Sequence, residues 1–161
     1  MPMREIICFH NPDENNGYLS NWYRCDFSAE GIRYSSMEQY MMYQKAVLFR
    51  DIEMAEQILA TDNVGKIKAL GRSVRNYEEI VWNGMRQITV YRGLCQKFEQ
   101  NAALKNKLLA TRDSILAECA VQDKIWGIGL SMKDERRFDL KRWQGQNLLG
   151  FSLMQVRAVL K

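Results

Sequence analysis

The spacing of apolar residues near the start of the chain is that of short strands. Residues 6–9 form a short apolar run in front of a turn-forming loop at 11–17, which predicts a strand followed by a polar connection. Residues 25–34 fit a β-hairpin whose turn is centred on 29–31. Two or three short strands are therefore expected to open the fold.

The period changes to that of a helix at Ser35. From there to Phe49, apolar or aromatic residues occupy most positions, as expected of a helix that is buried on several sides. Ser35 and Glu38, three residues apart, match a capping box. This pair predicts where the helix begins.

Further helical segments fill the middle of the chain. They are expected over residues 51–60, 63–71, 77–98 and 101–110. The second of these segments can be capped by Asp62 or Asn63 and can end at Gly71.

The chain closes with a strand pattern and then a helix pattern. Residues 115–120 alternate and predict a strand, whereas residues 147–160 predict the last helix. Four apolar residues fall on one face of that helix, namely Leu149, Leu153, Val156 and Leu160. Neither an internal repeat nor an interdomain linker is visible. The sequence thus predicts a mainly α (α+β) fold, a single helical domain over 1–161 with a small β element.

Composition narrows the class of protein. The 161 residues are 47% hydrophobic and 26% charged, with two prolines and ten glycines, which is typical of a globular protein. Lys and Arg exceed Asp and Glu by 23 − 19 = 4, an excess too small to indicate nucleic acid but compatible with an anionic small ligand. The chain has one histidine, His10, and four scattered cysteines without a CxxC pair. We therefore expect neither a metal nor another cofactor.

The N-terminal residues argue against export. Arg4 and Glu5 stand where a signal peptide would need its apolar core, and no apolar run approaches the ~20 residues of a membrane span. A cytoplasmic protein with reduced thiols and no membrane partner is the expectation, and the oligomeric state stays open.

The first predicted helix carries a carboxylate and an amine on one face. Glu38 and Lys45 are seven residues apart, which returns to within ~20° of the same face and separates them by ~10 Å along the axis. Partial burial of Lys45 would lower its pKa and expose an amine able to attack a carbonyl carbon. The alternative is that Glu38 only caps the helix and Lys45 reaches solvent. Spacing alone leaves both open.

Two other segments combine aromatic, amide and glycine residues. Asn21 and Trp22 follow a glycine-containing loop and suit a base or a sugar, although Trp22 fits a core position equally well. Gly127 and Gly129, together with the start of the last helix, would permit close approach of backbone N–H groups to a phosphate.

Six separated motifs resemble the NADAR (YbiA-like) family, in the same order and over nearly the whole chain. They are YLSNW at 18–22, SMEQYMMYQKA at 36–46, GR at 71–72, KF at 97–98, WGIGL at 126–130 and GQNLLGFSLM at 145–154. The resemblance implies a mainly α, metal-free N-glycosidase, a hydrolase acting on ADP-ribosyl groups attached to guanine or on ribosylamino intermediates of the riboflavin pathway. The implied partner is a nucleotide-derived small molecule or ADP-ribosylated nucleic acid.

The same resemblance assigns roles to single residues. It implies that Glu38 is an acid or base, that Lys45 is the amine that meets the anomeric carbon, and that Trp126 is a wall of the pocket. The remaining implied contacts are polar groups of Asn21, Gln44 and Asn147 and a phosphate contact at Arg72.

This chain departs from shorter relatives in two places, and two rival functions stay open. Ile128 stands where many relatives carry an acidic residue, and the longer segment 131–144 either alters which substrate fits or is a solvated loop. One rival is a non-catalytic module that binds ADP-ribose or NAD. The other is a nucleic-acid reader that uses the basic residues of 66–75.

Overall fold

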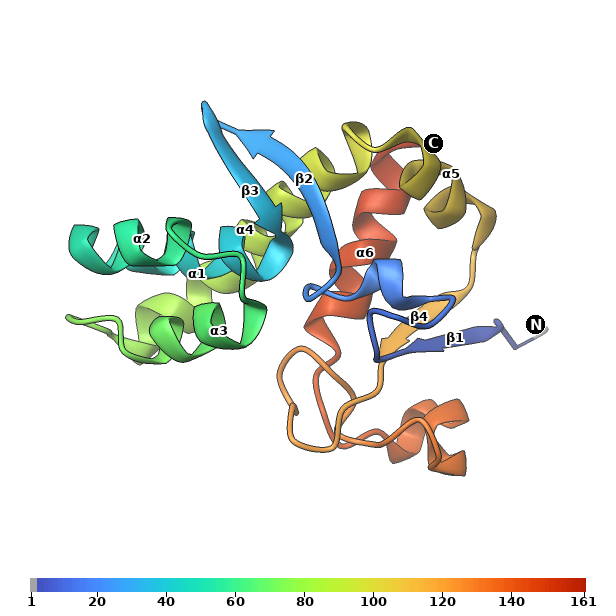
Figure 1. Cartoon of the computed structure of the whole chain (residues 1–161). Coiled ribbons are helices and arrows are strands. Elements are labelled where there is room, and N and C mark those ends of the chain that lie inside the picture. The colour runs from blue at the N-terminus through green and yellow to red at the C-terminus, as the bar shows by residue number, and fades with distance from the viewer. Residues whose placement is uncertain (1–2) are drawn as a thin grey trace. The chain divides into compact units, whose positions relative to one another are not determined.

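The computed structural model describes residues 3–161, which form two compact units. One unit is Asn21–Gln100, and the other combines the chain up to Ser20 with Asn101–Lys161. Figure 1 labels their helices and strands. The mainly α architecture with a small β element, expected from the sequence, is confirmed.

The unit Asn21–Gln100 consists of a hairpin followed by four helices. Its elements are β2 (Arg24–Ala29), β3 (Ile32–Ser36), α1 (Met37–Leu48), α2 (Ile52–Leu59), α3 (Val64–Arg72) and α4 (Glu79–Glu99). The hairpin is antiparallel and turns through Glu30 and Gly31, with φ of 52° and 80°. Two successive residues at positive φ are what a two-residue turn of matching twist requires. The predicted turn is thus confirmed.

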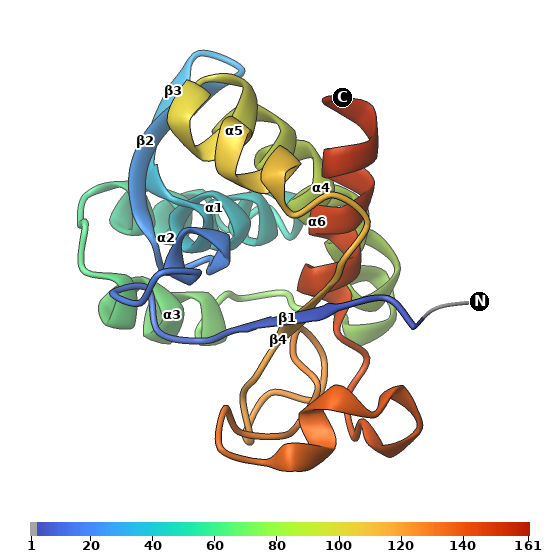
Figure 2. The ribbon, with the colours of Figure 1, turned by 90° about the vertical axis from the view of Figure 1, so that its right-hand side faces the viewer.

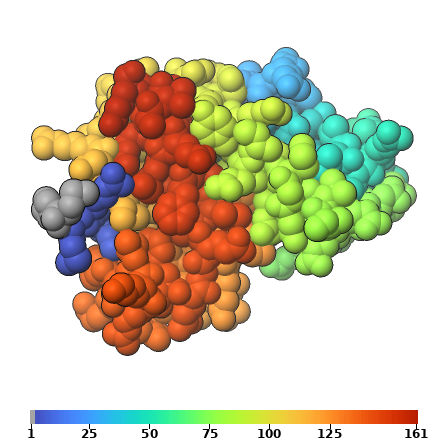
Figure 3. Space-filling model, turned by 180° about the vertical axis from the view of Figure 1, so that it is seen from behind, coloured from blue at the N-terminus to red at the C-terminus, as the bar shows by residue number. Residues whose placement is uncertain are grey.

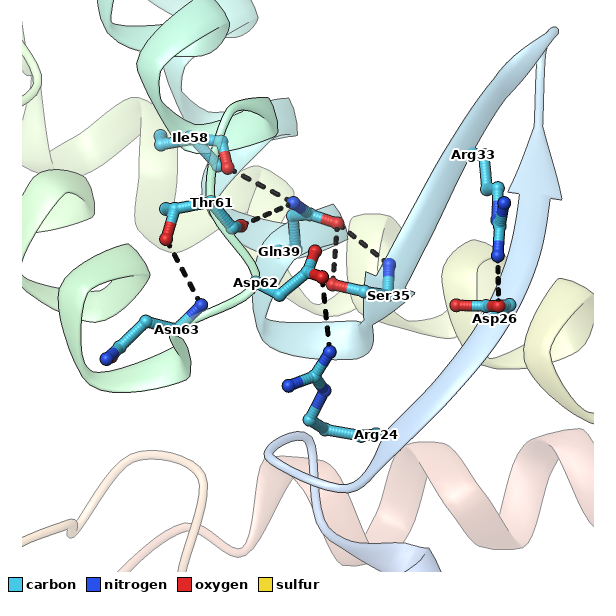
Figure 4. A network of polar contacts seen from close by, with 9 residues as sticks. All are labelled: Arg24, Asp26, Arg33, Ser35, Gln39, Ile58, Thr61, Asp62 and Asn63. Carbon is cyan, nitrogen blue, oxygen red and sulfur yellow. Dashed lines mark hydrogen bonds and ion pairs between the residues drawn. The ribbon is translucent and has the colours of Figure 1, made fainter.

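The start of α1 differs by one residue from the prediction. Ser36, not Ser35, is the N-cap, and its side chain accepts a hydrogen bond from the Gln39 N–H. The Gln39 amide in turn accepts from the Ser35 N–H at 2.8 Å and donates to the carbonyls of Ile58 and Thr61 (Figure 4). The capping box of Ser35 with Glu38 is therefore wrong, because pairing of β3 continues through Ser36.

Two glycines let neighbouring helices approach α1 closely. α1 packs against α2, α3 and α4. A Cβ on Gly71 would lie 1.9 Å from the Met42 sulfur, and one on Gly93 would lie 2.4 Å from the Tyr40 ring. The prediction that Gly71 ends its helix is wrong, because α3 runs on to Arg72 and Gly71 is used for packing.

The second unit holds a parallel strand pair covered by a helix. Its elements are β1 (Ile6–Phe9), η1 (Gly17–Leu19), α5 (Ala102–Ala110), β4 (Ile115–Glu118), η2 (Glu135–Phe138), η3 (Leu140–Arg142) and α6 (Leu148–Val159). β1 and β4 pair from Ile6 with Ile115 to Phe9 with Glu118, and Figure 2 shows them side by side. α6 packs on β4.

The predicted apolar face of α6 is confirmed. Leu149, Leu153 and Val156 are fully buried, and Leu160 is nearly so. On the same helix, the Arg157 guanidinium is buried and donates to the Thr111 hydroxyl and the Ser114 carbonyl, both at 2.8 Å. These bonds tie α6 to the turn that precedes β4.

The segment 131–144 is folded rather than an irregular loop. It contains η2 and η3, and the carboxylate of Asp134 holds the Arg136 guanidinium at 2.7 Å. The Trp143 indole donates to the Arg137 carbonyl, and its ring packs against a small buried cluster that includes Ile128. Within residues 3–161, no helix is long and apolar enough to span a membrane.

Candidate active site

Glu38 occupies the second position of α1 and is 5% exposed. Its backbone N–H donates to the Asn21 carbonyl at 2.9 Å, and the helix is capped by Ser36 instead. Capping therefore does not explain the carboxylate, since the serine already provides that interaction. The carboxylate of Glu38 is therefore buried on α1 without serving as the cap of that helix.

Lys45 lies about two turns further along α1, where it is half-buried. Its Nζ donates to the Gly71 carbonyl at 2.8 Å. Two aromatic rings lie beside the amine, that of Tyr77 at 4.7 Å and that of Trp82 at 5.9 Å from the ring centroid to Nζ. The close approach of α3 at Gly71 therefore brings a backbone acceptor to the amine.

The surroundings of Lys45 make the neutral amine easier to reach. Burial lowers the pKa of Lys45, the negative charge of Glu38 opposes that effect, and the positive charge of Arg72 adds to it. Glu38, Lys45 and Arg72 thus act on one another electrostatically. An amine with a depressed pKa is a better nucleophile at neutral pH.

Three of the four polar groups predicted around this pair, those of Asn21, Gln44 and Arg72, lie in the same unit as the pair. The Gln44 amide donates to the Tyr34 hydroxyl at 3.3 Å, and the Arg72 guanidinium is exposed at the end of α3. The Asn21 side-chain oxygen is buried and has no hydrogen-bond partner within residues 3–161. A buried acceptor in this state is costly unless a ligand donor meets it.

Trp22 is not a core residue. It is 38% exposed, and the Lys68 amine stands 5.7 Å from its ring centroid. The interpretation of this indole as a face available to a ligand is therefore favoured over the core alternative. Lys68, from the middle of α3, extends the positive charge in this region.

The motif residues of the other unit are engaged with their own backbone. Asn147 is fully buried at a φ of 53°, where its amide donates to the Leu116 carbonyl at 2.8 Å and accepts from the Glu118 N–H at 3.1 Å. The N–H of Leu149 reaches the Trp126 carbonyl at 3.2 Å. The start of α6 is thus held by main-chain acceptors rather than presented to an anion.

Gly127 and Gly129 have structural reasons to be glycine. A Cβ on Gly127 would lie 2.9 Å from the carbonyl oxygens of Asp123 and Glu118, and Gly129 has a φ of +73°. Trp126 is half-buried, and its backbone N–H donates to the Asp123 carboxylate at 2.8 Å. Ile128 between the two glycines is fully buried, so this position carries no acidic group toward a ligand.

Sequence reasoning missed the aromatic walls around Lys45. Tyr77 precedes α4 and packs its ring on Phe49 at 5.3 Å, whereas Trp82 is a buried residue of the first turn of α4. Both come more than thirty positions after Lys45, so no local period connects them to it. A hint existed in the prediction of a desolvated lysine, which requires apolar neighbours from elsewhere in the chain.

A protein-family comparison matches residues 8–161 to the NADAR domain. The N-glycosidase R617 of Acanthamoeba polyphaga mimivirus is 36% identical over 165 residues, which cover 98% of this chain and 97% of that protein. The riboflavin biosynthesis protein VVA0006 of Vibrio vulnificus is 32% identical over 159 residues, and the match covers 99% of this chain but 40% of that longer protein.

The fold comparison agrees with the sequence comparison. The NMR structure of the Escherichia coli protein YbiA superposes with a TM-score of 0.81 at 27% identity, covering 99% of this chain and 87% of that one. YbiA itself is named an N-glycosidase. With the family domain matched from Cys8 to the last residue, the chain belongs to the NADAR domain family and is an N-glycosidase.

Proposed function

We propose that the residues around Lys45 cleave the C1′–N bond of an ADP-ribosylated guanine base, in a nucleic acid or a nucleotide, or of a related ribosylamino nucleotide. The observation that carries this proposal is a half-buried amine with a lowered pKa, which lies near two aromatic rings and is acted on by the charge of the buried carboxylate of Glu38. Cleavage at an anomeric carbon passes through a cation-like sugar, which a carboxylate stabilises.

The proposed reaction has two stages. The Lys45 amine attacks C1′, the C1′–N bond breaks, and its electron pair leaves with the base, which takes a proton. The sugar ring then opens to an imine as the ring oxygen is protonated. Water adds to C1′, the amine departs, and the ring closes to the free sugar. Glu38 moves the protons in both stages, which is worth roughly 10²–10⁴ in rate.

The remaining predicted contacts serve binding in this proposal. Arg72 is exposed and cationic, which suits a phosphate. The buried Asn21 oxygen suits a donor on the sugar or base, and the open face of Trp22 suits stacking. Trp126 and Asn147 belong to the second unit, where the Asn147 amide is bonded to the backbone of β4, and they are given no contact in this proposal. Since the family domain spans both units, we propose that the chain is a single domain.

A riboflavin-pathway intermediate is the second candidate substrate. Its support is the relationship to the riboflavin biosynthesis protein VVA0006.

The basic residues of 66–75 bear on a nucleic-acid substrate. Arg75 already pairs with Asp51 at 2.9 Å, whereas Lys66 and Lys68 on α3 are not in the ion pairs found within residues 3–161. Two lysines near Arg72 are available to touch a phosphate backbone.

The deciding experiment offers both substrates separately. The protein is incubated with ADP-ribosylated guanosine DNA and, in parallel, with a ribosylamino-pyrimidine phosphate, and products are followed by mass spectrometry. Release of ADP-ribose from the first alone assigns the guanine adduct, and cleavage of the second alone assigns the riboflavin-type substrate. Lys45→Arg is the matched inactive control.

Turnover of the substrate is expected to survive a strong chelator. Loss of turnover that is restored by added metal would contradict the metal-free mechanism.

A further inference from the structure

The outward face of α4 is apolar over its first half. Trp82, Arg86 and Val90 point inward and are buried, as are later residues of the same face. On the opposite side, four large apolar side chains are exposed, namely Ile80 at 80%, Val81 at 42%, Met85 at 40% and Ile88 at 41%. Figure 3 shows the green to yellow-green residues that include α4 at the molecular surface. Contiguous apolar side chains on a surface helix mark interaction sites.

The outward face repeats with the period of a coiled-coil seam. Its residues follow one another at alternating spacings of three and four, the heptad a and d positions: Val81, Gly84 and Ile88, which are exposed, and then Tyr91 and Cys95, which are half-buried. Gly84 stands in a helix interior, where glycine destabilises relative to alanine. Outside its own helix, no atom of the described residues lies within 4 Å of the place where its Cβ would be, so Gly84 leaves an open gap in this face.

Charge decides the direction in which a second helix fits. Met85 and Arg92 lie seven residues apart along one edge of the seam, at the position called e, and Glu78, the N-cap residue just before α4, continues this spacing by one step beyond the helix. In an antiparallel pair e meets e, which places Glu78 against the partner's Arg92 twice and Met85 against the partner's Met85. A parallel pair would instead place Arg92 beside Gln87 and form no ion pair. Neither Glu78 nor Arg92 is in an ion pair found within residues 3–161.

The same register satisfies the seam. When Gly84 faces the partner's Ile88, two-fold symmetry also sets Val81 against the partner's Tyr91. In each layer a larger side chain thus meets a smaller residue, as in a knob packed into a hole. We propose that α4 is a self-association surface, where a second copy of this chain packs antiparallel through Val81, Gly84, Ile88 and Tyr91.

The oligomeric state of the full chain tests this proposal. Light scattering after size exclusion is expected to give a mass that rises with concentration from 18.9 kDa toward twice that value. Ile88→Glu should weaken association about tenfold or more, since a charge enters the centre of the seam. Ile52→Glu, on an exposed isoleucine of α2, is the matched control and should associate like wild type. A wild-type mass of 18.9 kDa at every concentration overturns the proposal.

Cysteine cross-linking tests the direction independently of any disruptive variant. Met85→Cys should form a covalent dimer under mild oxidation, because position 85 meets its own copy only in the antiparallel arrangement. Gly84→Cys should not, and the opposite pattern overturns the antiparallel packing. Glu78→Arg should weaken the dimer about threefold to tenfold, and adding Arg92→Glu should restore it. Failure of that restoration also contradicts the register.

Discussion

The helix α1 and the segment 126–147 both carry family motifs, yet their polar side chains have different surroundings. On α1, the Lys45 amine donates to a backbone carbonyl, lies near two aromatic rings, and is acted on by the charge of the buried Glu38 carboxylate. In the segment 126–147, the Asn147 amide is bonded to strand β4 at both ends. The motif residues therefore fall into two groups, those whose side chains are candidates for catalysis and those whose side chains bond to the backbone.

The glycines of the segment 126–147 and the carboxylate of Glu38 differ in what their positions require. Gly127 and Gly129 are explained by close carbonyl oxygens and a positive φ, without any ligand. Glu38 differs in kind, because it is a buried ionisable group whose negative charge acts on the pKa of Lys45, while Ser36 supplies the helix cap. A buried ionisable group with a specific charge partner is the stronger candidate for catalysis.

The largest expected effect is at Lys45. Lys45→Arg keeps a positive charge but cannot form an imine, because the guanidinium stays protonated. We expect turnover to fall by about 10³ or more while ligand still binds, as for other lost nucleophiles. Borohydride added during wild-type turnover should leave a sugar adduct on the peptide containing Lys45.

The trapping result separates mechanisms as well as residues. No adduct together with substantial activity of Lys45→Arg would mean that the lysine acts only through its charge. The covalent mechanism would then be wrong, while the family membership would stand. An adduct on any other lysine would move the nucleophile away from α1.

A smaller loss is expected at Glu38. Glu38→Gln keeps the shape and the backbone hydrogen bond to Asn21 but removes charge and proton transfer. We expect a loss of about 10² in kcat. The melting temperature should stay near that of wild type, since the carboxylate does not cap the helix. Activity close to wild type would contradict the catalytic assignment.

Sequence patterns predicted the elements well wherever the signal was local. The strand at 6–9, the hairpin turn and the buried face of α6 each follow from a period or turn signature within a few residues. The start of α1 was displaced because Ser35 and Ser36 each have Glu or Gln three positions later, so both fit a capping box. Only pairing with β2 decides between them.

The candidate site was predictable in its α1 residues and not in its surroundings. Glu38 and Lys45 share a helix face, which spacing reveals. The Gly71 carbonyl reaches Lys45 only because that glycine packs against Met42, a contact between residues 29 positions apart. Tyr77 is likewise brought to Lys45 by tertiary packing. Such long-range contacts leave no periodic trace.

In the segment 126–147, removal of a motif residue should cost stability rather than catalysis. Asn147→Ala leaves the Leu116 carbonyl and the Glu118 N–H without their buried partner, which we expect to cost about 2–4 kcal/mol. Asn147→Gly is the control for backbone strain. Glycine tolerates the positive φ at this position, so this variant loses only the hydrogen bonds of the side-chain amide. Chemical denaturation measures the loss. A kcat/KM of folded protein that drops more than about tenfold would instead favour substrate contact.

The smallest expected effect, a shift in pH dependence, comes from Arg72. Burial lowers the pKa of Lys45, Glu38 raises it, and the positive charge of Arg72 lowers it further. Removing that charge in Arg72→Gln should therefore raise the pKa of Lys45, so the amine loses its proton at a higher pH. The rising limb of kcat/KM against pH should therefore move to higher pH. Activity should be about twofold to fivefold lower near neutral pH and should recover at alkaline pH. The effect is small because the charge of Arg72 is exposed and screened by solvent.

Lys68→Gln removes a neighbouring charge of α3 that is not among the causes of the shifted pKa of Lys45, which are burial, Glu38 and Arg72, so its pH profile should match that of wild type. High salt should shrink the difference between Arg72→Gln and wild type, because the charge acts through solvent. If Arg72 only binds a phosphate, KM would rise equally at every pH and the limb would not move. That result would separate binding by Arg72 from tuning of the amine, and it would leave burial as the main cause of the lowered pKa of Lys45.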